Sequence, residues 1–442
     1  MTAASSGAIT PVIPAPAWRG GWAQGLAYGS LGLPLAFVAL PLYVILPNHY
    51  ASAYGIPLAT LGALLLGARL FDAVADPYIG RWVDALFGRS ATAVLMAAVA
   101  AAVVLVIGFR GLFFPAVQGA DALLWWCALL LGVTYLSYSV LSVRHQAWGA
   151  RLGGDEAQRA RIVSWREGLA LAGVLVASVL PSLAGLSVAS IVFALTLAAG
   201  VALLARAPQP RVHIATGAAP ALTAPLATPA FRRLLAIYLV NGVASAVPAT
   251  LVLFFIRDRL QAPTMEPLFL ASYFAAGALS MPLWLRVVAA LGIARSWRLG
   301  MLLAVVSFAW AALLGSGDVL AFTLVCIASG VALGADLALP GALLAGVIQR
   351  EGHSGQLEGG YFGWWNFATK LNLALAAGIA LPLLQLFGYT PGSREPEALQ
   401  ALTLAYSLLP CVLKLAAAAL LTTGWIRREV RSDMERPRRC SG

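Results

Sequence analysis

The sequence predicts an all-α polytopic membrane protein with twelve transmembrane helices. Of its 442 residues, 60% are hydrophobic and only 11% are charged, and the mean hydropathy is +0.84, outside the range of soluble globular domains. In lipid, a chain this apolar must satisfy its backbone hydrogen bonds internally, which helices do. The length accommodates about twelve spans of roughly twenty residues joined by short loops.

Apolar stretches divide the chain into spans, tails and one linker. The predicted spans are 24–46, 58–82, 92–112, 122–144, 160–183, 186–206, 232–256, 267–290, 296–316, 319–346, 361–388 and 399–426. An Ala-, Pro- and Thr-rich cytoplasmic linker, 207–230, separates the sixth span from the seventh, so we expect two pseudo-symmetric six-helix bundles, 24–206 and 231–426. Residues 1–23 lack the basic segment of a signal peptide and are predicted to be a disordered cytoplasmic tail. Residues 427–442 form a basic cytoplasmic tail.

The arginines orient the chain in the membrane. If both termini are cytoplasmic, twenty arginines lie in or beside cytoplasmic segments, and only Arg110, Arg257, Arg259 and Arg394 lie outside. The positive-inside rule therefore predicts a multi-pass protein of the inner or plasma membrane with both termini inside. This topology and contact with anionic lipid headgroups account for the net charge of +11, so nucleic acid is not an expected partner.

A polar stripe in the second span is the strongest functional signal. At about 100° per residue, Arg69, Asp72, Asp76 and Gly80 lie within one narrow arc of a helix. Charged side chains in hydrocarbon cost several kcal/mol, so such groups face a water-filled cavity or a partner. Two carboxylates on one face suggest a cation site, and we expect no other metal site. The alternative is a structural ion pair in which Arg69 neutralises Asp72.

The chain has only two lysines, and both lie in predicted spans. A buried lysine needs a counter-charge or must lose its proton. By analogy with two-bundle transporters, whose second and eleventh helices face each other, Lys370 is expected to pair with Asp72 or Asp76 across the central cavity. The alternative is that Lys370 extends to the cytoplasmic edge. Lys414 has no obvious partner in the sequence and is interpreted as structural.

Other polar groups in the spans are weaker candidates for substrate contact. Arg166 can hold a carboxylate or sugar hydroxyls with its guanidinium fork, whereas Glu167 points about 100° away and is not expected to share its site. Asn241, Asp336 and Trp365 are further candidates. The alternatives are a helix kink at Asn241, a bond between neighbouring helices at Asp336, and an interfacial or packing role for Trp365.

A short loop at the cytoplasmic end of the second span contains Asp84 and Arg89. Such a pair can bond neighbouring helix ends and act as a latch for one conformation, with a solvated turn as the alternative. A membrane enzyme is a distant alternative, because the four histidines are scattered and no nucleotide-binding or metal-spaced motif occurs. The cysteines are interpreted as packing residues, without disulfides.

The run 69–84, Arg-Leu-Phe-Asp-Ala-Val-Ala-Asp-Pro-Tyr-Ile-Gly-Arg-Trp-Val-Asp, resembles the second-helix signature of the glycoside–pentoside–hexuronide:cation symporters, the melibiose permease branch of the major facilitator superfamily. Tyr-Gly-Ser-Leu-Gly-Leu-Pro at 28–34, Arg-His-Gln-Ala-Trp at 144–148 and Gly-Tyr-Phe-Gly-Trp-Trp-Asn-Phe-Ala-Thr-Lys at 360–370 support the resemblance. These motifs lie in both halves, so the resemblance covers nearly the whole chain.

The resemblance implies a monomeric symporter of a sugar, glycoside or similar small polar solute, working by alternating access with substrate at mid-membrane. It assigns the coupling ion, Na⁺ or H⁺, to Asp72 and Asp76, the nearby lysine of the eleventh helix to Lys370, and a sugar-contacting arginine to Arg166. No cofactor is implied.

Three positions depart from the family pattern. Ala36 stands where a first-helix acid binds the galactoside in melibiose permease, and the place of a fourth-helix acid falls near Ser142. Arg144 stands where many relatives keep proline. These departures leave open H⁺ or weak Na⁺ coupling, a substrate other than a galactoside, a lysophospholipid carrier of the same branch, and a non-transporting sensor.

Overall fold

The computed structural model describes residues 18, 20–210 and 221–427. These residues form α-helices joined by short 3-10 and π segments, with no strand among them, which confirms the all-α prediction. Most of the predicted N-terminal tail, the middle of the linker and all but one residue of the C-terminal tail lie outside the described residues. The predictions made for those parts stay predictions.

The helices between residues 22 and 205, here called the N-half, follow the predicted spans closely. They are α1 (Trp22–Gly29), α2 (Gly32–Leu40), α3 (Leu46–Tyr54), α4 (Leu58–Phe87), α5 (Ala91–Phe113), α6 (Ala120–Arg151) and α7 (Glu156–Ala205). Ser90 and Asp155 cap α5 and α7 by accepting backbone N–H bonds of 3.0 and 2.8 Å, which satisfies donors that a helix start leaves free. Gly185, with a φ of 82°, interrupts α7 between the predicted fifth and sixth spans.

The helices between residues 224 and 426 are here called the C-half. They are α8 (Ala224–Ala227), α9 (Pro229–Phe254), α10 (Glu266–Leu279), α11 (Met281–Leu291), α12 (Ile293–Ala311), α13 (Val319–Arg350), α14 (Glu358–Leu386), α15 (Pro396–Thr403) and α16 (Leu409–Leu421). π segments continue α9 through Phe255–Arg259 and join α15 to α16 through Leu404–Leu408.

Helix length and hydropathy set the number of candidate membrane crossings. Within the described residues, nine helical segments are long and apolar enough to cross a membrane, or ten if the α10–α11 pair, bent by 42°, forms one crossing. The fifty residues of α7 enter that count once, although Gly185 interrupts this helix. Twelve crossings therefore remains a prediction.

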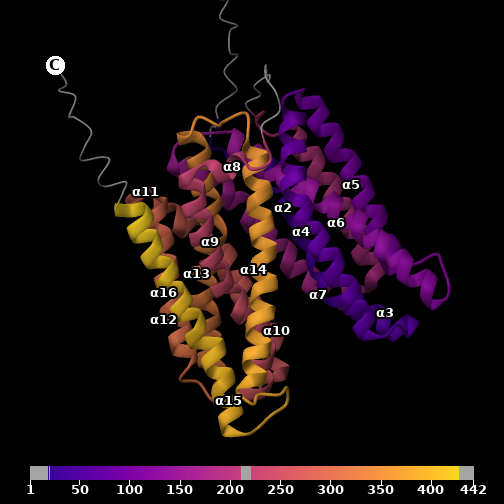
Figure 1. Cartoon of the computed structure of the whole chain (residues 1–442), viewed down its shortest axis with the longest axis vertical. Coiled ribbons are helices and arrows are strands. Elements are labelled where there is room, and N and C mark those ends of the chain that lie inside the picture. Colours follow the sequence, from indigo (N-terminus) through magenta and orange to yellow (C-terminus); the bar gives the residue numbers. More distant parts are fainter. Residues whose placement is uncertain (1–17, 19, 211–220, 428–442) are drawn as a thin grey trace, which may run out of the picture.

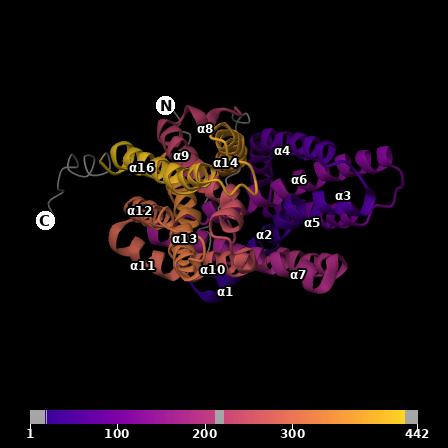
Figure 2. The same ribbon diagram turned by 90° about the horizontal axis from the view of Figure 1, so that it is seen from below.

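The two halves lie side by side and differ in how closely they approach along their length. In Figure 1 they meet near α8 and diverge toward α3 and α15, and Figure 2 shows the same separation from below. The contacts between them run from α4 and α6 to α14, and from α7 to α10, α11 and α13. The arrangement therefore leaves the halves joined at one end.

Glycines allow α4 and α14 to touch along their backbones. A Cβ on Gly80 would collide with the carbonyl of Gly359, and a Cβ on Gly363 would lie 2.5 Å from the carbonyl oxygen of Asp76. Small residues are the usual device for such close helix approach in membranes. This approach brings Lys370, two turns further along α14, within reach of the acidic stripe on α4.

Candidate functional site

Lys370 joins the two halves through the acidic stripe. Its Nζ lies 2.7 Å from Asp72 Oδ2 and 2.7 Å from Asp76 Oδ2. It also donates to Ser139 Oγ on α6 at 2.8 Å, and Ser139 in turn donates to Asp72 Oδ1 at 2.7 Å. The ammonium group thus lies among oxygens from α4 and α6, in the place a small cation would take.

The site is buried and carries a charge imbalance. The side chains of Asp72 and Asp76 are 3% and 0% exposed, and that of Lys370 is 19% exposed. Asp76 Oδ1 is buried and has no hydrogen-bond partner among the residues that the structure describes, although buried polar atoms are normally paired. With both carboxylates and the ammonium group ionised, the site has one net negative charge, which one proton or one Na⁺ would neutralise.

Arg69, the first residue of the polar stripe, contacts the ring of Tyr43. Its guanidinium carbon is 3.9 Å from the centroid of the Tyr43 ring, a cation–π contact, and the side chain is exposed. The counter-charge that Asp72 contacts is Lys370, so the geometry does not favour the alternative in which Arg69 neutralises Asp72.

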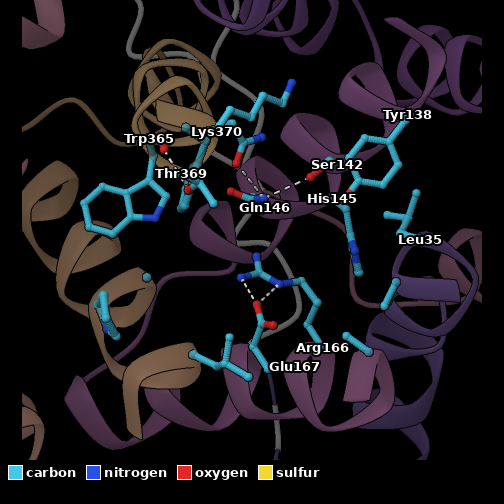
Figure 3. Close-up of a pocket in the computed structure, with 18 of the residues that line it drawn as sticks. Leu35, Tyr138, Ser142, His145, Gln146, Arg166, Glu167, Trp365, Thr369 and Lys370 are labelled. Carbon is cyan, nitrogen blue, oxygen red and sulfur yellow. Dashed lines mark hydrogen bonds and ion pairs between the residues drawn. The ribbon is translucent and has the colours of Figure 1, made fainter. Parts of the chain in front are cut away.

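A cavity of about 320 Å³ lies between the halves next to this site (Figure 3). Its wall includes Lys370, Trp365 and Thr369 from α14, Tyr138, Ser142 and Gln146 from α6, and Ala36 from α2. Both positions where the family acids are missing, Ala36 and Ser142, therefore line the cavity, without a carboxylate.

Arg166 and Glu167 both line this cavity, which corrects the expectation that adjacent residues would not share one site. Arg166 donates to Glu167 Oε1 from Nε at 2.9 Å and from Nη2 at 2.5 Å. The ion pair bends the two side chains toward each other, as Figure 3 shows. Both remain partly exposed to the cavity, at 13% and 18%.

Aromatic and amide groups complete the wall. Trp365 stacks on Tyr238 with ring centroids 3.8 Å apart, and both residues line the cavity. Gln146 donates to Ser142 Oγ at 3.0 Å and, across the two halves, to Asn366 Oδ1 at 3.1 Å. The cavity thus offers a ring face and several neutral hydrogen-bonding groups.

A second lysine–aspartate centre lies inside the C-half. Lys414 contacts Asp336 Oδ2 and donates to Asn241 Oδ1 at 2.9 Å and Ser245 Oγ at 2.8 Å. Asn241 and Trp297 donate to Asp336 Oδ1 at 3.1 and 3.0 Å. Lys414 therefore has the partner that the sequence did not reveal. Asp336 lines the central cavity, whereas Asn241 is absent from its lining and is bonded within this network.

Asp84, predicted as part of a latch, pairs with Arg151. Arg151 donates to Asp84 Oδ1 at 2.8 Å, lies 3.1 Å from Glu358 Oε2 and donates to the carbonyl of Gly355. Asp84 also accepts the backbone N–H groups of residues 359 and 360, both at 2.7 Å, at the start of α14, where a negative charge is favourable. Arg89 is exposed and forms no ion pair among the described residues, so its part in a latch stays a prediction.

Sequence reasoning missed Ser139, Arg151 and Glu358. Arg151 counted only as one of many cytoplasmic arginines, and a serine in an apolar helix gives almost no signal.

Arg144, which stands where many relatives keep proline, is fully buried. Its guanidinium carbon lies 5.9 Å from the Trp148 ring, and its nitrogens have no hydrogen-bond partner among the described residues. Among the residues that the structure describes, no cluster of three or more His, Cys, Asp or Glu could hold a metal ion.

Comparison with known proteins gives the same class. The family described as MFS/sugar transport protein matches residues 26–426. The inner membrane symporter YicJ of Escherichia coli is 28% identical over 159 residues, and the putative glycoside/cation symporter YagG of the same organism is 28% identical over 156 residues. Each alignment covers 35% of this chain and 33% of the relative, so the chain spans a third of the length of these curated relatives.

Solved structures share the fold at low identity. A bacterial homologue of the iron transporter ferroportin in an outward-facing state has a TM-score of 0.67 and 16% identity, covering 90% of this chain and 99% of that one. The fucose:proton symporter FucP of Escherichia coli has a TM-score of 0.64 and 12% identity, covering 89% and 98%. These likenesses confirm the major facilitator fold and concern the fold alone.

Proposed function

Because the chain belongs to the MFS/sugar transport protein family, we propose that it is a secondary-active symporter that couples Na⁺ or H⁺ to the uptake of a sugar, glycoside or similar small polar solute. The family is one of transporters, so the predicted transporter, rather than an enzyme, is confirmed, as is the resemblance drawn from the motifs. The coupling ion, the solute, the inner-membrane location and cytoplasmic termini belong to the proposal.

The observation that carries the proposal is Lys370 held between two carboxylates of the opposite half. Its ammonium group pairs with Asp72 and Asp76 and ties α14 to α4. A Na⁺ ion or proton that binds one carboxylate leaves Lys370 to pair with the other carboxylate alone and so weakens this contact. Cation binding therefore acts directly on a contact between the halves, which is the requirement for coupling in alternating access.

Charge neutralisation explains why the site would take up one monovalent cation. Ionised groups in the low-dielectric middle of a membrane are costly unless they are paired. The site has two carboxylates and one ammonium group, so a proton or Na⁺ brings it to neutrality. A proton needs one carboxylate, and the unpaired Asp76 Oδ1 can accept it. Na⁺ needs several oxygens, which Asp72, Asp76 and Ser139 can supply.

The side chains that line the central cavity favour a neutral polyhydroxylated solute. Arg166 and Glu167 cancel each other's charge through the bonds from Nε and Nη2 to Oε1, and both side chains are partly exposed to the cavity. A donor beside an acceptor suits neighbouring hydroxyl groups of a sugar. The ring face of Trp365 suits the apolar face of a pyranose.

Thermal unfolding of the purified full chain in detergent, across Na⁺ concentration and pH, tests the proposal without a known solute. A ligand that binds only the folded state raises stability by RT ln(1 + [L]/Kd). Saturable stabilisation by Na⁺ over choline, lost in Asp76→Asn and kept in the exposed control Asp121→Asn, supports a sodium site. A Na⁺-insensitive protein whose stability shifts with pH through Asp76 supports proton coupling. If stability responds to neither Na⁺ nor the protonation of Asp76, coupling at this site is contradicted.

One observation favours a second candidate, transport of an amphiphile. A lateral cavity of about 490 Å³ lies between α7 and the α10–α11 pair, with Trp22, Trp165, Met281 and Leu285 in its wall and Arg161 beside them. An apolar wall with one basic group suits a lipid with an anionic headgroup. Uptake of a lysophospholipid into proteoliposomes, with a neutral glycoside as competitor, separates this candidate from sugar transport.

A further inference from the structure

A third cavity, of about 130 Å³, is lined by C-half residues. Its walls come from α9, α10, α12, α13, α16 and the π segment before α16. Five aromatic side chains line it: Phe269, Tyr273, Phe274, Phe308 and Tyr406. We call this cavity with its five rings the aryl pocket.

The aryl pocket and the central cavity share Asp336, which is part of both walls. On α13 the next turn continues the same boundary, because Leu333 lines the aryl pocket and Leu337 lines the central cavity. Asp336 is 11% exposed and is held by Lys414. Asp336 therefore lies at the boundary between the two cavities, with the central cavity on one side and the aryl pocket on the other.

The size and chemistry of the aryl pocket define the group that fits it. Cavities near 150 Å³ with apolar walls accommodate a benzene ring, so this pocket has room for about one ring. Aromatic walls favour a flat apolar group through edge and stacking contacts. The hydroxyls of Tyr273 and Tyr406 have no hydrogen-bond partner among the described residues, so a single polar substituent on the ring could be satisfied there.

We propose that the aryl pocket binds the apolar, ring-sized aglycone of a glycoside whose sugar lies in the central cavity. This inference rests on the proposed function and names the substrate class, glycosides with a small aromatic or cyclic aglycone. Lys414 neutralises Asp336 at the boundary, so the aglycone meets no uncompensated charge as it passes.

The position of the aryl pocket in one half has a consequence for transport. Every residue of its wall belongs to the C-half, so contacts made there persist while the halves move against each other. Binding energy of this kind stabilises outward- and inward-facing states alike. The aglycone is therefore expected to raise affinity for the glycoside without changing the number of cations transported per solute.

Matched pairs of methyl and phenyl glycosides test the inference on the purified full chain. Calorimetry would measure the dissociation constants of methyl and phenyl β-glucoside, β-galactoside and β-xyloside. For a sugar that binds, we expect the phenyl member to bind about tenfold more tightly, because a buried phenyl ring removes apolar area from water. Equal affinities within each pair would overturn the inference while leaving sugar symport intact.

Three alanine-to-leucine variants locate the effect. Ala249→Leu at the exposed rim and Ala304→Leu in the wall fill the aryl pocket, whereas Ala271→Leu is an exposed control on α10 that lines no described cavity. We expect both filling variants to lose the phenyl advantage and keep methyl-glycoside binding, and the control to keep both. An advantage that survives both filling variants would place the ring elsewhere. If no glycoside of either kind binds, the proposed sugar symport fails and the inference with it.

Discussion

The two lysine–aspartate centres of this molecule differ in where they lie and in how completely they are bonded. Lys414 and Asp336 lie within the C-half, and Asn241, Ser245 and Trp297 supply further bonds to them. Lys370 and its carboxylates lie across the two halves and leave Asp76 Oδ1 without a partner. Both centres bury a lysine beside a carboxylate, yet only the second has binding capacity left.

The difference indicates two roles for the same chemistry. A buried ion pair whose hydrogen bonds are all made holds a structure rigidly, because either partner alone would be an uncompensated charge. A centre with a free oxygen and a separable ammonium group can exchange one cation for another. We therefore propose that the C-half centre serves stability and the inter-half centre serves coupling.

The largest effect should come from the coupling centre. Asp76→Asn removes the acid whose oxygen is free, so we expect cation-driven accumulation in proteoliposomes to fall to background while exchange of preloaded solute continues. The exposed variant Asp121→Asn should behave like the wild type. Full concentrative uptake by Asp76→Asn would contradict the assignment of coupling to this site.

The next effect concerns stability and separates the two lysines. Lys414→Met leaves Asp336 buried without its counter-charge, and we expect the free energy of unfolding to fall by ~3–5 kcal/mol. Lys370→Met should cost less, because Asp72 and Asp76 can take up a proton or a cation instead.

Denaturant unfolding of both lysine variants measures this difference. Asp336→Leu combined with Lys414→Met should recover part of the loss, because the double variant buries no single charge. Equal losses in Lys414→Met and Lys370→Met would remove the distinction between the two centres.

A smaller effect is expected at the Arg151–Asp84–Glu358 contact, here called the latch, which also joins the halves. Arg151→Gln leaves Asp84 and Glu358 close together without their shared cation, so we expect the end of the molecule near α8 to open more often. The rate at which a thiol reagent added from that side labels Ser142→Cys should rise several-fold. Arg89→Gln, the matched control on an exposed arginine, should leave the rate unchanged, and a similar rise there would contradict the latch.

The smallest effect should follow Arg69→Gln. Its cation–π contact with Tyr43 is exposed, and such contacts contribute ~0.5–1 kcal/mol. We expect an unfolding free energy within about 1 kcal/mol of the wild type and unchanged cation dependence. A loss of coupling in this variant would return Arg69 to the site as a charge partner of Asp72.

The sequence alone located the acidic stripe because carboxylates in an apolar helix are conspicuous. Asp72, Asp76 and Lys370 are such groups, and their mutual distances confirm the expected pairing. The predicted helix ends lie within several residues of the observed ones, because the apolar runs stop at Gly, Pro and charged residues. The break at Gly185 falls between two predicted spans.

Partner choice could not be predicted, because it depends on which helices touch. The partners of Lys414 are set by the packing of α16 against α9, and those of Asp84 by the positions of α6 and the start of α14. The sequence does not show either packing. Arg166 and Glu167 share a site because their long side chains bend toward each other, which the 100° step of the helix does not reveal. Hydrogen-bonding groups such as Ser139 carry too little signal to be selected from a chain with many serines.

The charge at Asp72, Asp76 and Lys370 also determines which step of the proposed transport cycle responds to the membrane potential. With two carboxylates and one ammonium group, the empty site is an anion, and the site loaded with one monovalent cation is neutral. An interior-negative voltage repels that anion, so it pushes the unloaded carrier toward the state that opens outward, by up to ~2.3 kcal/mol per 100 mV if the charge crosses the whole field. The cell's voltage would then speed the return of the empty carrier rather than the inward step of the loaded one.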